Sequence, residues 1–151
     1  DRLRQFGTMM VNSGVKCVVV DDLTMARWEK LVWNVPFNGL SAALDKTVDL
    51  IVGDDMLRTR AEQLMKEVQT AARACGSAIE DAILDKMMDY TLKMKPYFTS
   101  MHLDRRNGQP METEAIVGAP LRRGKANGAE LPELQVLYSQ LKAVEAGPCN
   151  D

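Results

Sequence analysis

Apolar positions along this chain recur mostly every three or four residues, the period of an α-helix with one buried face. The clearest case runs from Asp55 to Gly76, where Asp54 and Asp55 offer N-capping carboxylates and Gly76 offers a closing residue. This pattern predicts a helix whose core-facing stripe consists of Leu57, Ala61, Leu64, Val68, Ala71 and Cys75.

Other segments carry the same signature, so we expect an all-α fold, a bundle of five to seven helices. The other expected helices span 3–12, closed by Ser13 and Gly14; 23–44, capped by Asp21 or Asp22 and kinked at Pro36; 79 to just before Pro96, opened by a capping box at Ser77 and Glu80; 112–127, closed by Gly128; and a last helix from Pro132. Their expected buried faces include Ile79, Ile83, Met87 and Tyr90 in the third of these helices, and Leu134, Leu137, Leu141 and Val144 in the last.

Two segments lack the helical period. Residues 15–20, the only β-branched run, are either a strand that pairs with something outside this chain or a merely extended segment. The polar stretch from Pro96 to Pro110 is expected to be an irregular loop.

Composition narrows the class of protein. Of 151 residues, 46% are hydrophobic and 26% are charged, the balance of a globular domain, and we assign residues 1–151 to one domain. The net charge of −2 provides no basic surface for nucleic acid. A single histidine, His102, excludes a multi-histidine metal site, so we expect no metal.

The three cysteines, Cys17, Cys75 and Cys149, form no CxxC pair and no disulfide framework, so we expect a reducing, cytoplasmic setting. No apolar run approaches the roughly 20 residues that cross a bilayer, so no membrane partner is expected. The chain starts at Asp1 in what reads as the middle of a helix, and we expect it to be a piece of a longer protein. None of its ten glycines are spaced as GxG, which excludes a dinucleotide-binding fingerprint.

One predicted helix carries polar side chains where an apolar surface is expected. Lys30, Asn34 and Asn38 follow one another at i, i+4 and i+8 and therefore form one ridge. Two interpretations are open. In the first, the asparagines cap backbone groups near Pro36 and Lys30 snorkels to water. In the second, the ridge lines a cleft that binds an anionic, carbonyl-bearing small molecule. The ridge lies opposite the apolar cluster Trp28, Leu31, Val32 and Val35 and is flanked by Trp33 and Phe37.

A second polar segment covers residues 99–118. Taken alone, it is typical of an exposed loop that leads to a helix with Glu112 and Glu114 in its first turn. The run from Asp104 to Arg106 is equally typical of a surface ion-pair cluster. His102 has no partner visible in the sequence, so we assign it no catalytic role.

Together, the two polar segments resemble the C-terminal domain of the ketopantoate reductase (2-dehydropantoate 2-reductase) family. The residues that carry the resemblance are Trp28-Glu29-Lys30-Leu31-Val32-Trp33-Asn34 with Asn38 and Leu40-Ser41-Ala42, then Ser100-Met101-His102-Leu103-Asp104 with Glu112-Thr113-Glu114 and Gly118. The stretch from Gly128 to Tyr138 is similar to the family's last helix, and the resemblance extends over about residues 8–143.

The resemblance implies a helical fold related to the C-terminal domain of 6-phosphogluconate dehydrogenases. It implies an NADPH-dependent oxidoreductase that reduces 2-dehydropantoate to pantoate in pantothenate and coenzyme A biosynthesis. The implied partners are the 2-oxo acid, an N-terminal Rossmann domain that holds most of the NADPH, and a second copy in a homodimer. Residues 1–21 would then connect to the Rossmann domain, and this chain alone is expected to be inactive.

The resemblance also implies roles for single residues. Lys30 is the general acid that protonates the ketone oxygen as hydride arrives. Asn34 and Asn38 bind the substrate, and Ser100 holds its carboxylate. Glu112 contributes to catalysis through the substrate hydroxyl or a contact with the cofactor.

Two departures from the family pattern leave the substrate open. Gly39 stands where the family often has proline, with Pro36 before it, and residues 45–53 offer no clear match to a further substrate-binding asparagine. Two other functions are therefore kept: a helical module for dimerisation or ligand binding without turnover, and a related 2-oxo acid, 3-hydroxy acid or opine-type dehydrogenase. The spacing of Lys30, Asn34 and Asn38 favours the reductase over the second of these.

Overall fold

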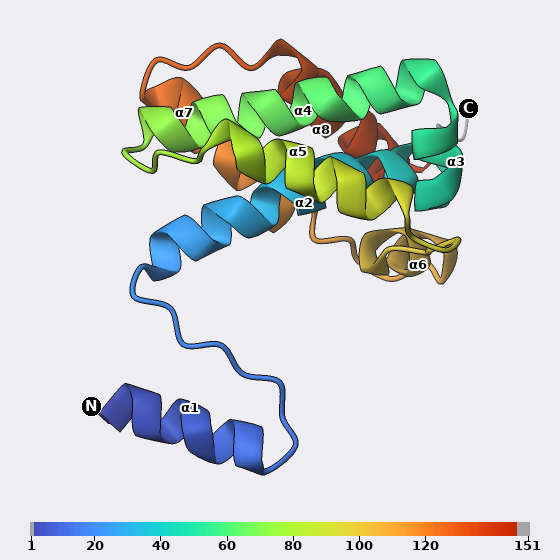
Figure 1. The fold of residues 1–151 in the computed structure, drawn as a ribbon. Coiled ribbons are helices and arrows are strands. Elements are labelled where there is room, and N and C mark those ends of the chain that lie inside the picture. The colour runs from blue at the N-terminus through green and yellow to red at the C-terminus, as the bar shows by residue number, and fades with distance from the viewer. Residues whose placement is uncertain (1, 148–151) are drawn as a thin grey trace.

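A computed structural model describes residues 2–147 of the chain, and within this range all regular structure is helical. The all-α prediction is therefore confirmed, although eight α-helices and a π-helical turn exceed the five to seven expected. Figure 1 shows α2–α8 packed into one body, with α1 standing apart at the end of a connecting segment. The elements are α1 Arg2–Asn12, α2 Leu23–Leu44, α3 Val48–Gly53, α4 Asp55–Ala74, α5 Asp81–Leu92, α6 Ser100–Arg106, η1 Glu114–Gly118, α7 Ala119–Ala126 and α8 Pro132–Ala146.

Helix α2 is the centre of this body and has the bounds that the sequence predicts. The Asp22 carboxylate caps it by accepting a hydrogen bond from the Met25 amide at 2.9 Å. The helix continues through Pro36, which is buried. It packs against α3, α4, α5, α6, α8 and η1. Its contributions to the core include the fully buried Val32, Val35, Phe37 and Leu40.

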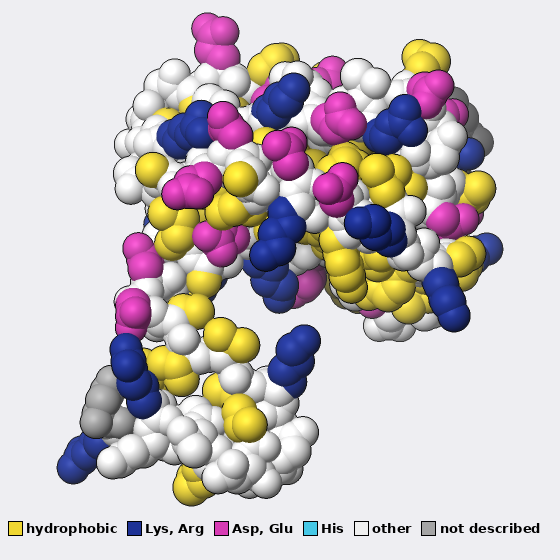
Figure 2. Space-filling model, in the orientation of Figure 1, with side chains coloured by type: hydrophobic (Ala, Val, Ile, Leu, Met, Phe, Trp, Pro, Cys, Tyr) yellow, Lys and Arg dark blue, Asp and Glu magenta, His cyan; other side chains and the backbone are white. Residues whose placement is uncertain are grey.

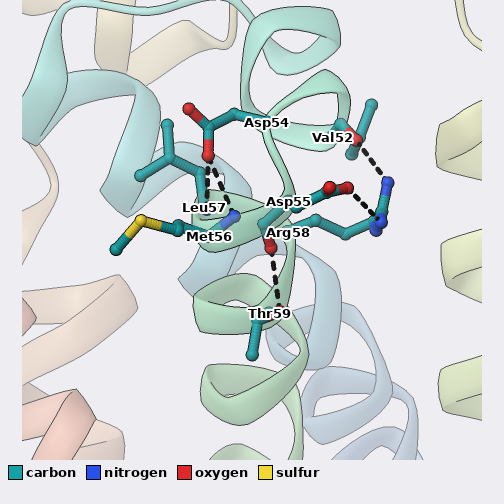
Figure 3. Close-up of polar contacts among 7 residues, drawn as sticks. All are labelled: Val52, Asp54, Asp55, Met56, Leu57, Arg58 and Thr59. Atoms are coloured by element: carbon teal, nitrogen blue, oxygen red, sulfur yellow. Dashed lines mark hydrogen bonds and ion pairs between the residues drawn. The ribbon is translucent and has the colours of Figure 1, made fainter.

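The junction between α3 and α4 is fixed by side chains that the sequence marks as caps (Figure 3). Asp54 accepts hydrogen bonds from the amides of Met56 at 2.9 Å and Leu57 at 3.1 Å. Asp55 pairs with Arg58 at 2.6 Å, and the same guanidinium donates to a carbonyl oxygen of α3 at 3.2 Å. The start of α4 is thereby held against the helix before it.

The end of α4 shows why one cap prediction is wrong. Gly76 adopts φ 87°, and the Ser77 amide donates to the Ala72 carbonyl at 2.8 Å, which is the hydrogen bond of a Schellman motif. Ser77 therefore closes α4 and does not open α5 through a capping box. Helix α5 begins three residues later than the box requires, after Glu80, whose side chain makes no capping hydrogen bond.

The buried face of α5 also differs from the predicted one. Ile79 is buried but precedes the helix, and Tyr90 is 67% exposed. The neighbouring Thr91 is buried instead and accepts a hydrogen bond from the Trp33 indole at 2.9 Å. Ile83 and Met87 do pack against the core as predicted, so the prediction is wrong only at the two ends of the stripe.

The prediction of an irregular loop between Pro96 and Pro110 is wrong, because this segment contains α6. Thr99 caps this helix by accepting from the His102 amide at 3.3 Å, and Gly108, with φ 64°, follows its end. A helix of seven residues is too short to show the apolar period by which longer helices are found in a sequence.

The predicted helix 112–127 is divided in two. It begins at Glu114 with a π-helical turn and continues as α7, which Gly128 follows as expected. Helix α8 starts at Pro132, with Leu134, Leu137 and Leu141 fully buried as predicted and Val144 only half-buried. The N-terminus of α8 has no capping side chain of its own. Glu67 of α4 takes that role by accepting from the amides at 133 and 134.

Residues 2–20 present apolar side chains to the outside. Residues 15–20 form no strand in the structure and run as an irregular segment beside α1, where Val19 packs on Gly7. Figure 2 shows hydrophobic side chains over this protruding part of the molecule. The exposed ones are Leu3, Phe6, Met9, Val11, Val15, Val18 and Val20.

Candidate active site

The polar ridge of α2 passes from solvent into the interior. Lys30 is exposed, Asn34 is half-buried, and Asn38 is only 5% exposed. Neither carboxamide forms a hydrogen bond with another residue between 2 and 147, and this argues against the interpretation that the asparagines cap nearby backbone. Because α2 also buries Val32 and Val35 on its other side, the ridge presents unpaired polar groups from a helix that is otherwise embedded in the core.

Two buried hydroxyls lack a hydrogen-bond partner within the described range. Ser41 Oγ lies on α2 three residues after Asn38, so it extends the ridge, and Thr113 Oγ1 lies directly after Glu112. Neither hydroxyl has a role that was predicted from the sequence. The helical spacing from Asn34 through Asn38 to Ser41 is the signal from which the first could have been found.

Ser100 and Glu112 lie on segments that both lead to α2. Ser100 is the first residue of α6 and is exposed, and α6 packs against α2. Glu112 is exposed in the turn before η1, where its carbonyl oxygen accepts from the Ile116 amide at 2.9 Å, and η1 also contacts α2. The fold thus brings both segments to the helix that carries Lys30. That the side chains share one cleft stays a prediction.

Two hollows border α2. At about 100° per residue, the α2 residues that line them lie on opposite sides of the ridge. The first, of about 270 Å³, separates α2 from η1 and α7, and the second, of about 640 Å³, separates α2 from α5. The first is lined by Thr24, Arg27, Trp28, Leu31, Ala115, Ala119, Pro120 and Arg123; the second by Glu29, Trp33, Ile83, Lys86, Met87, Tyr90, Met94 and Tyr97.

A charged network holds the π-helical turn that follows Glu112. Glu114 accepts hydrogen bonds from the Tyr138 hydroxyl and, at 2.8 Å, from Arg122, while the Lys142 ammonium lies 3.8 Å away. These hydrogen bonds, first that of Tyr138, lower the pKa of the Glu114 carboxyl, and the bond to Glu114 raises the pKa of Tyr138. Gly118 permits this approach, because a Cβ there would lie 2.6 Å from the Glu114 carboxylate.

His102, for which the sequence showed no partner, has one in the structure. Its Nε2 lies 2.7 Å from the carboxylate of Asp45, the residue after the end of α2. This hydrogen bond is the main reason that the pKa of Asp45 is lowered, and the charge of Arg106 contributes. Arg105 donates to the Ala42 carbonyl, so the two arginines bind α2 and its end and do not form the surface ion-pair cluster with Asp104.

Residues 2–147 give no support to a metal site or a membrane span. Across residues 2–147, no three His, Cys, Asp or Glu side chains are grouped so as to hold a metal ion. None of the helices in that range is long and apolar enough to cross a membrane. Cys17 and Cys75 are free thiols, and Cys149 lies outside the described residues.

Comparison with known proteins matches the chain to a family. The family described as ketopantoate reductase PanE/ApbA C terminal matches residues 22–145. A 2-dehydropantoate 2-reductase of Nostoc sp. is 43% identical over 145 residues, which are 96% of this chain and 46% of the relative.

Solved structures give the same result. A 2-dehydropantoate 2-reductase from Geobacter metallireducens has a TM-score of 0.89 and 41% identity, over 93% of this chain and 48% of the other. The dimeric ketopantoate reductase from Staphylococcus aureus has a TM-score of 0.87 and 28% identity, over 95% and 50%. The chain spans about half the length of these relatives. It belongs to the family of ketopantoate reductase C-terminal domains, whose helical fold is of the type found in the C-terminal domains of 6-phosphogluconate dehydrogenases.

Proposed function

We propose that this chain is the substrate-binding half of an NADPH-dependent 2-oxo acid reductase, and that its substrate is 2-dehydropantoate. Membership of the family and the names of its relatives support the reaction class. The observation that carries the proposal is the ridge of Lys30, Asn34 and Asn38. A helix that is otherwise packed in the core keeps an exposed ammonium and two carboxamides that form no hydrogen bond within residues 2–147, so all three are free to pair with a bound anionic ketone.

Each ridge residue then has a chemical task. Lys30 donates a proton to the ketone oxygen, and its charge stabilises the alkoxide that develops there. Asn34 and Asn38 donate or accept hydrogen bonds along the substrate, and Ser100 holds the carboxylate. Glu112, exposed before η1, acts on the substrate hydroxyl or contacts the cofactor.

The cofactor belongs mainly to a part of the protein that precedes this chain. NADPH supplies the hydride when it is bound. Residues 2–147 offer it the exposed carboxylate of Glu112 but no glycine-rich phosphate-binding loop, so we assign its phosphates to an N-terminal Rossmann domain.

The N-terminal residues support such a domain. The apolar side chains of α1 and of residues 15–20 are exposed, and the segment 15–20 has unpaired backbone groups along most of its length. Both features fit a segment that packs against a further domain, because exposed apolar surface of this extent marks an interface. We also propose a homodimer, in line with the dimeric relative, and a cytoplasmic enzyme, with which the free thiols of Cys17 and Cys75 agree.

Steady-state kinetics on the protein with its complete N-terminal half test the proposal. With NADPH, 2-dehydropantoate should be reduced with a kcat/KM of at least about 10⁴ per molar per second, in the range of ordinary enzymes. Aromatic 2-oxo acids and branched 2-oxo acids without a hydroxyl group serve as competing substrates. A value of kcat/KM for one of them far above that for 2-dehydropantoate would contradict the substrate, and no turnover of any 2-oxo acid would support the binding module without catalysis.

A further inference from the structure

Helix α6 is joined to the end of α2 by a hydrogen bond between a buried histidine and a half-exposed aspartate. His102 is 1% exposed, and its Nε2 lies 2.7 Å from Oδ1 of Asp45. Arg106 approaches the same oxygen, with Nε at 3.6 Å. Asp45 itself closes α2 in the left-handed region, at φ 53°, where glycine is the usual residue. An aspartate at this position gives the end of α2 a carboxylate that reaches α6.

The imidazole of His102 forms one hydrogen bond within the described residues, through Nε2. Its Nδ1 is buried and has no partner within residues 2–147, so the imidazole is satisfied best as the tautomer that donates from Nε2 to Asp45. The ring of Phe98 lies against the histidine, with ring centroids 5.3 Å apart, and the Arg106 guanidinium lies 5.6 Å from the centre of the Phe98 ring. These contacts come from α6 or from the residues just before it, and they cover the imidazole, while the Asp45 side chain stays 48% exposed.

The position of Ser100 depends on these contacts. Ser100 is the first residue of α6 and stands two residues before His102. A helix of seven residues is not stable by itself, so tertiary contacts decide where it lies. The pair formed by His102 and Asp45, together with the hydrogen bond from Arg105 to Ala42, supplies polar contacts that tie α6 to α2. A shift of α6 would move the Ser100 hydroxyl relative to the ridge on α2.

We propose that the hydrogen bond between His102 and Asp45 is a latch that places Ser100 for the carboxylate of the substrate, so that His102 is a positioning residue of the reductase. The proposal rests on the function proposed above, which assigns Ser100 to that carboxylate. The proposed role of His102 does not involve proton transfer, because its imidazole is buried and its Nε2 is already paired with Asp45.

A cycle of variants in the complete enzyme tests the latch. His102→Leu should raise the KM for 2-dehydropantoate about tenfold, which corresponds to ~1.4 kcal/mol, and should change kcat and the KM for NADPH less than about threefold. Asp45→Asn keeps an acceptor oxygen and tolerates the left-handed backbone, so it should raise the KM less than His102→Leu does. In a Ser100→Ala background, His102→Leu should have almost no further effect on the KM, because the residue through which it acts is gone.

A matched control separates the latch from general loosening of the fold. Arg60→Gln breaks another half-buried pair between two helices, with Glu133 at 3.0 Å, and should leave the KM unchanged. The latch is refuted if His102→Leu leaves the KM for the 2-oxo acid unchanged, or if it raises the KM by the same factor with and without Ser100.

A second measurement needs no turnover. Hydrogen exchange of the α6 amides, followed by mass spectrometry without substrate, should be at least about tenfold faster in His102→Leu and unchanged in Arg60→Gln. If the wild-type enzyme reduces no 2-oxo acid, the proposed function fails, and the exchange rates still report on the contact. Unchanged exchange in α6 would refute the latch even in an active enzyme.

Discussion

Asn38 shows in one residue why the ridge points to a ligand. It is 5% exposed, and its carboxamide has no hydrogen-bond partner within the described range. Asparagine is unfavourable inside a helix, because its side chain competes for backbone hydrogen bonds. A leucine at this position would avoid this cost. Binding of a substrate that pairs with the carboxamide is the compensation that our proposal supplies.

Lys30→Ala in the complete enzyme should lower kcat for ketone reduction by roughly two to four orders of magnitude, the usual contribution of a positioned general acid. The folded structure should be retained, because Lys30 is exposed and lies opposite the buried Trp28 and Val32. Lys30→Arg should not restore the rate, since a guanidinium is wider and gives up its proton far less readily. Stopped-flow or steady-state measurement of NADPH consumption provides the rates.

The control for this prediction is Lys66→Ala, an exposed lysine on α4 that should leave the rate unchanged. If Lys30→Ala retained near-normal turnover, Lys30 would be a surface residue whose ammonium only snorkels to water, as in the alternative interpretation of the ridge.

At the scale of elements, Gly39 determines how closely α8 packs on the ridge-bearing helix. A Cβ at this position would lie 2.7 Å from a methyl carbon of Leu137, which is fully buried. Gly39→Ala should therefore lower the free energy of unfolding by about 1–3 kcal/mol, the usual cost of overpacking a core. Chemical denaturation of the variant measures this loss.

Gly53→Ala is the matched control, because Gly53 ends α3 with no atom within 4 Å of the added Cβ and without a positive φ. It should be neutral or slightly stabilising. Equal stability of Gly39→Ala and the wild type would mean that α8 can shift on α2, and that the close packing described here is not required.

The sequence could predict those elements whose evidence is local. The bounds of α2 and the start of α4 follow from Asp22 and Asp54, which cap through their own neighbouring amides. Helix α6 could not be predicted, because its stability comes from contacts with α2. The partner of His102 is 57 residues away, at Asp45. Pairings at such a distance leave no periodic pattern in one sequence.

The candidate site residues also fall into those that a local sequence pattern could predict and those that it could not. Lys30, Asn34 and Asn38 could be grouped from helical spacing alone, because one helix carries all three. Ser100 and Glu112 entered only through the resemblance, and no local pattern joins them to α2. The structure adds that α6 and η1 both pack on α2. Their roles stay predictions.

At the scale of the whole molecule, stability should fall in acid. The pKa values of Asp45, Asp81 and Glu114 are lowered, that of Asp81 by hydrogen bonds from Gln69 and Arg73. Because the folded pKa lies below the unfolded value, near 3.8 for Asp and 4.5 for Glu, each contribution is complete above the unfolded pKa. It is lost as the pH falls through the folded pKa.

Thermal melts between neutral pH and about pH 3 check this expectation. The Tm should drop below about pH 4, and Asp81→Asn should reduce the slope of that drop. Asp89→Asn, at an exposed position of α5 without an ion pair in the described structure, serves as the control and should reproduce the wild-type slope. A wild-type Tm that stays constant down to pH 3 would contradict the lowered pKa values of Asp45, Asp81 and Glu114.

The chain of residues 1–151 should be helical but should not bind NADPH tightly, because the phosphate-binding element belongs to the half of the enzyme that we place before it. Titration followed by NADPH fluorescence should show no saturation in the low micromolar range, about the upper limit for a tight cofactor site. Saturable binding in that range by this chain would contradict the proposal that an N-terminal Rossmann domain binds the cofactor.

The structure of the complete enzyme with NADP⁺ and pantoate bound tests the central claim most directly. We expect the Lys30 ammonium within hydrogen-bond distance, about 2.7–3.2 Å, of the 2-hydroxyl oxygen of pantoate, and Ser100 beside the carboxylate. Asn34 and Asn38 should contact the same molecule. Pantoate bound elsewhere, or Ser100 turned into bulk water on the far side of the bundle, would contradict the site while leaving the fold as described.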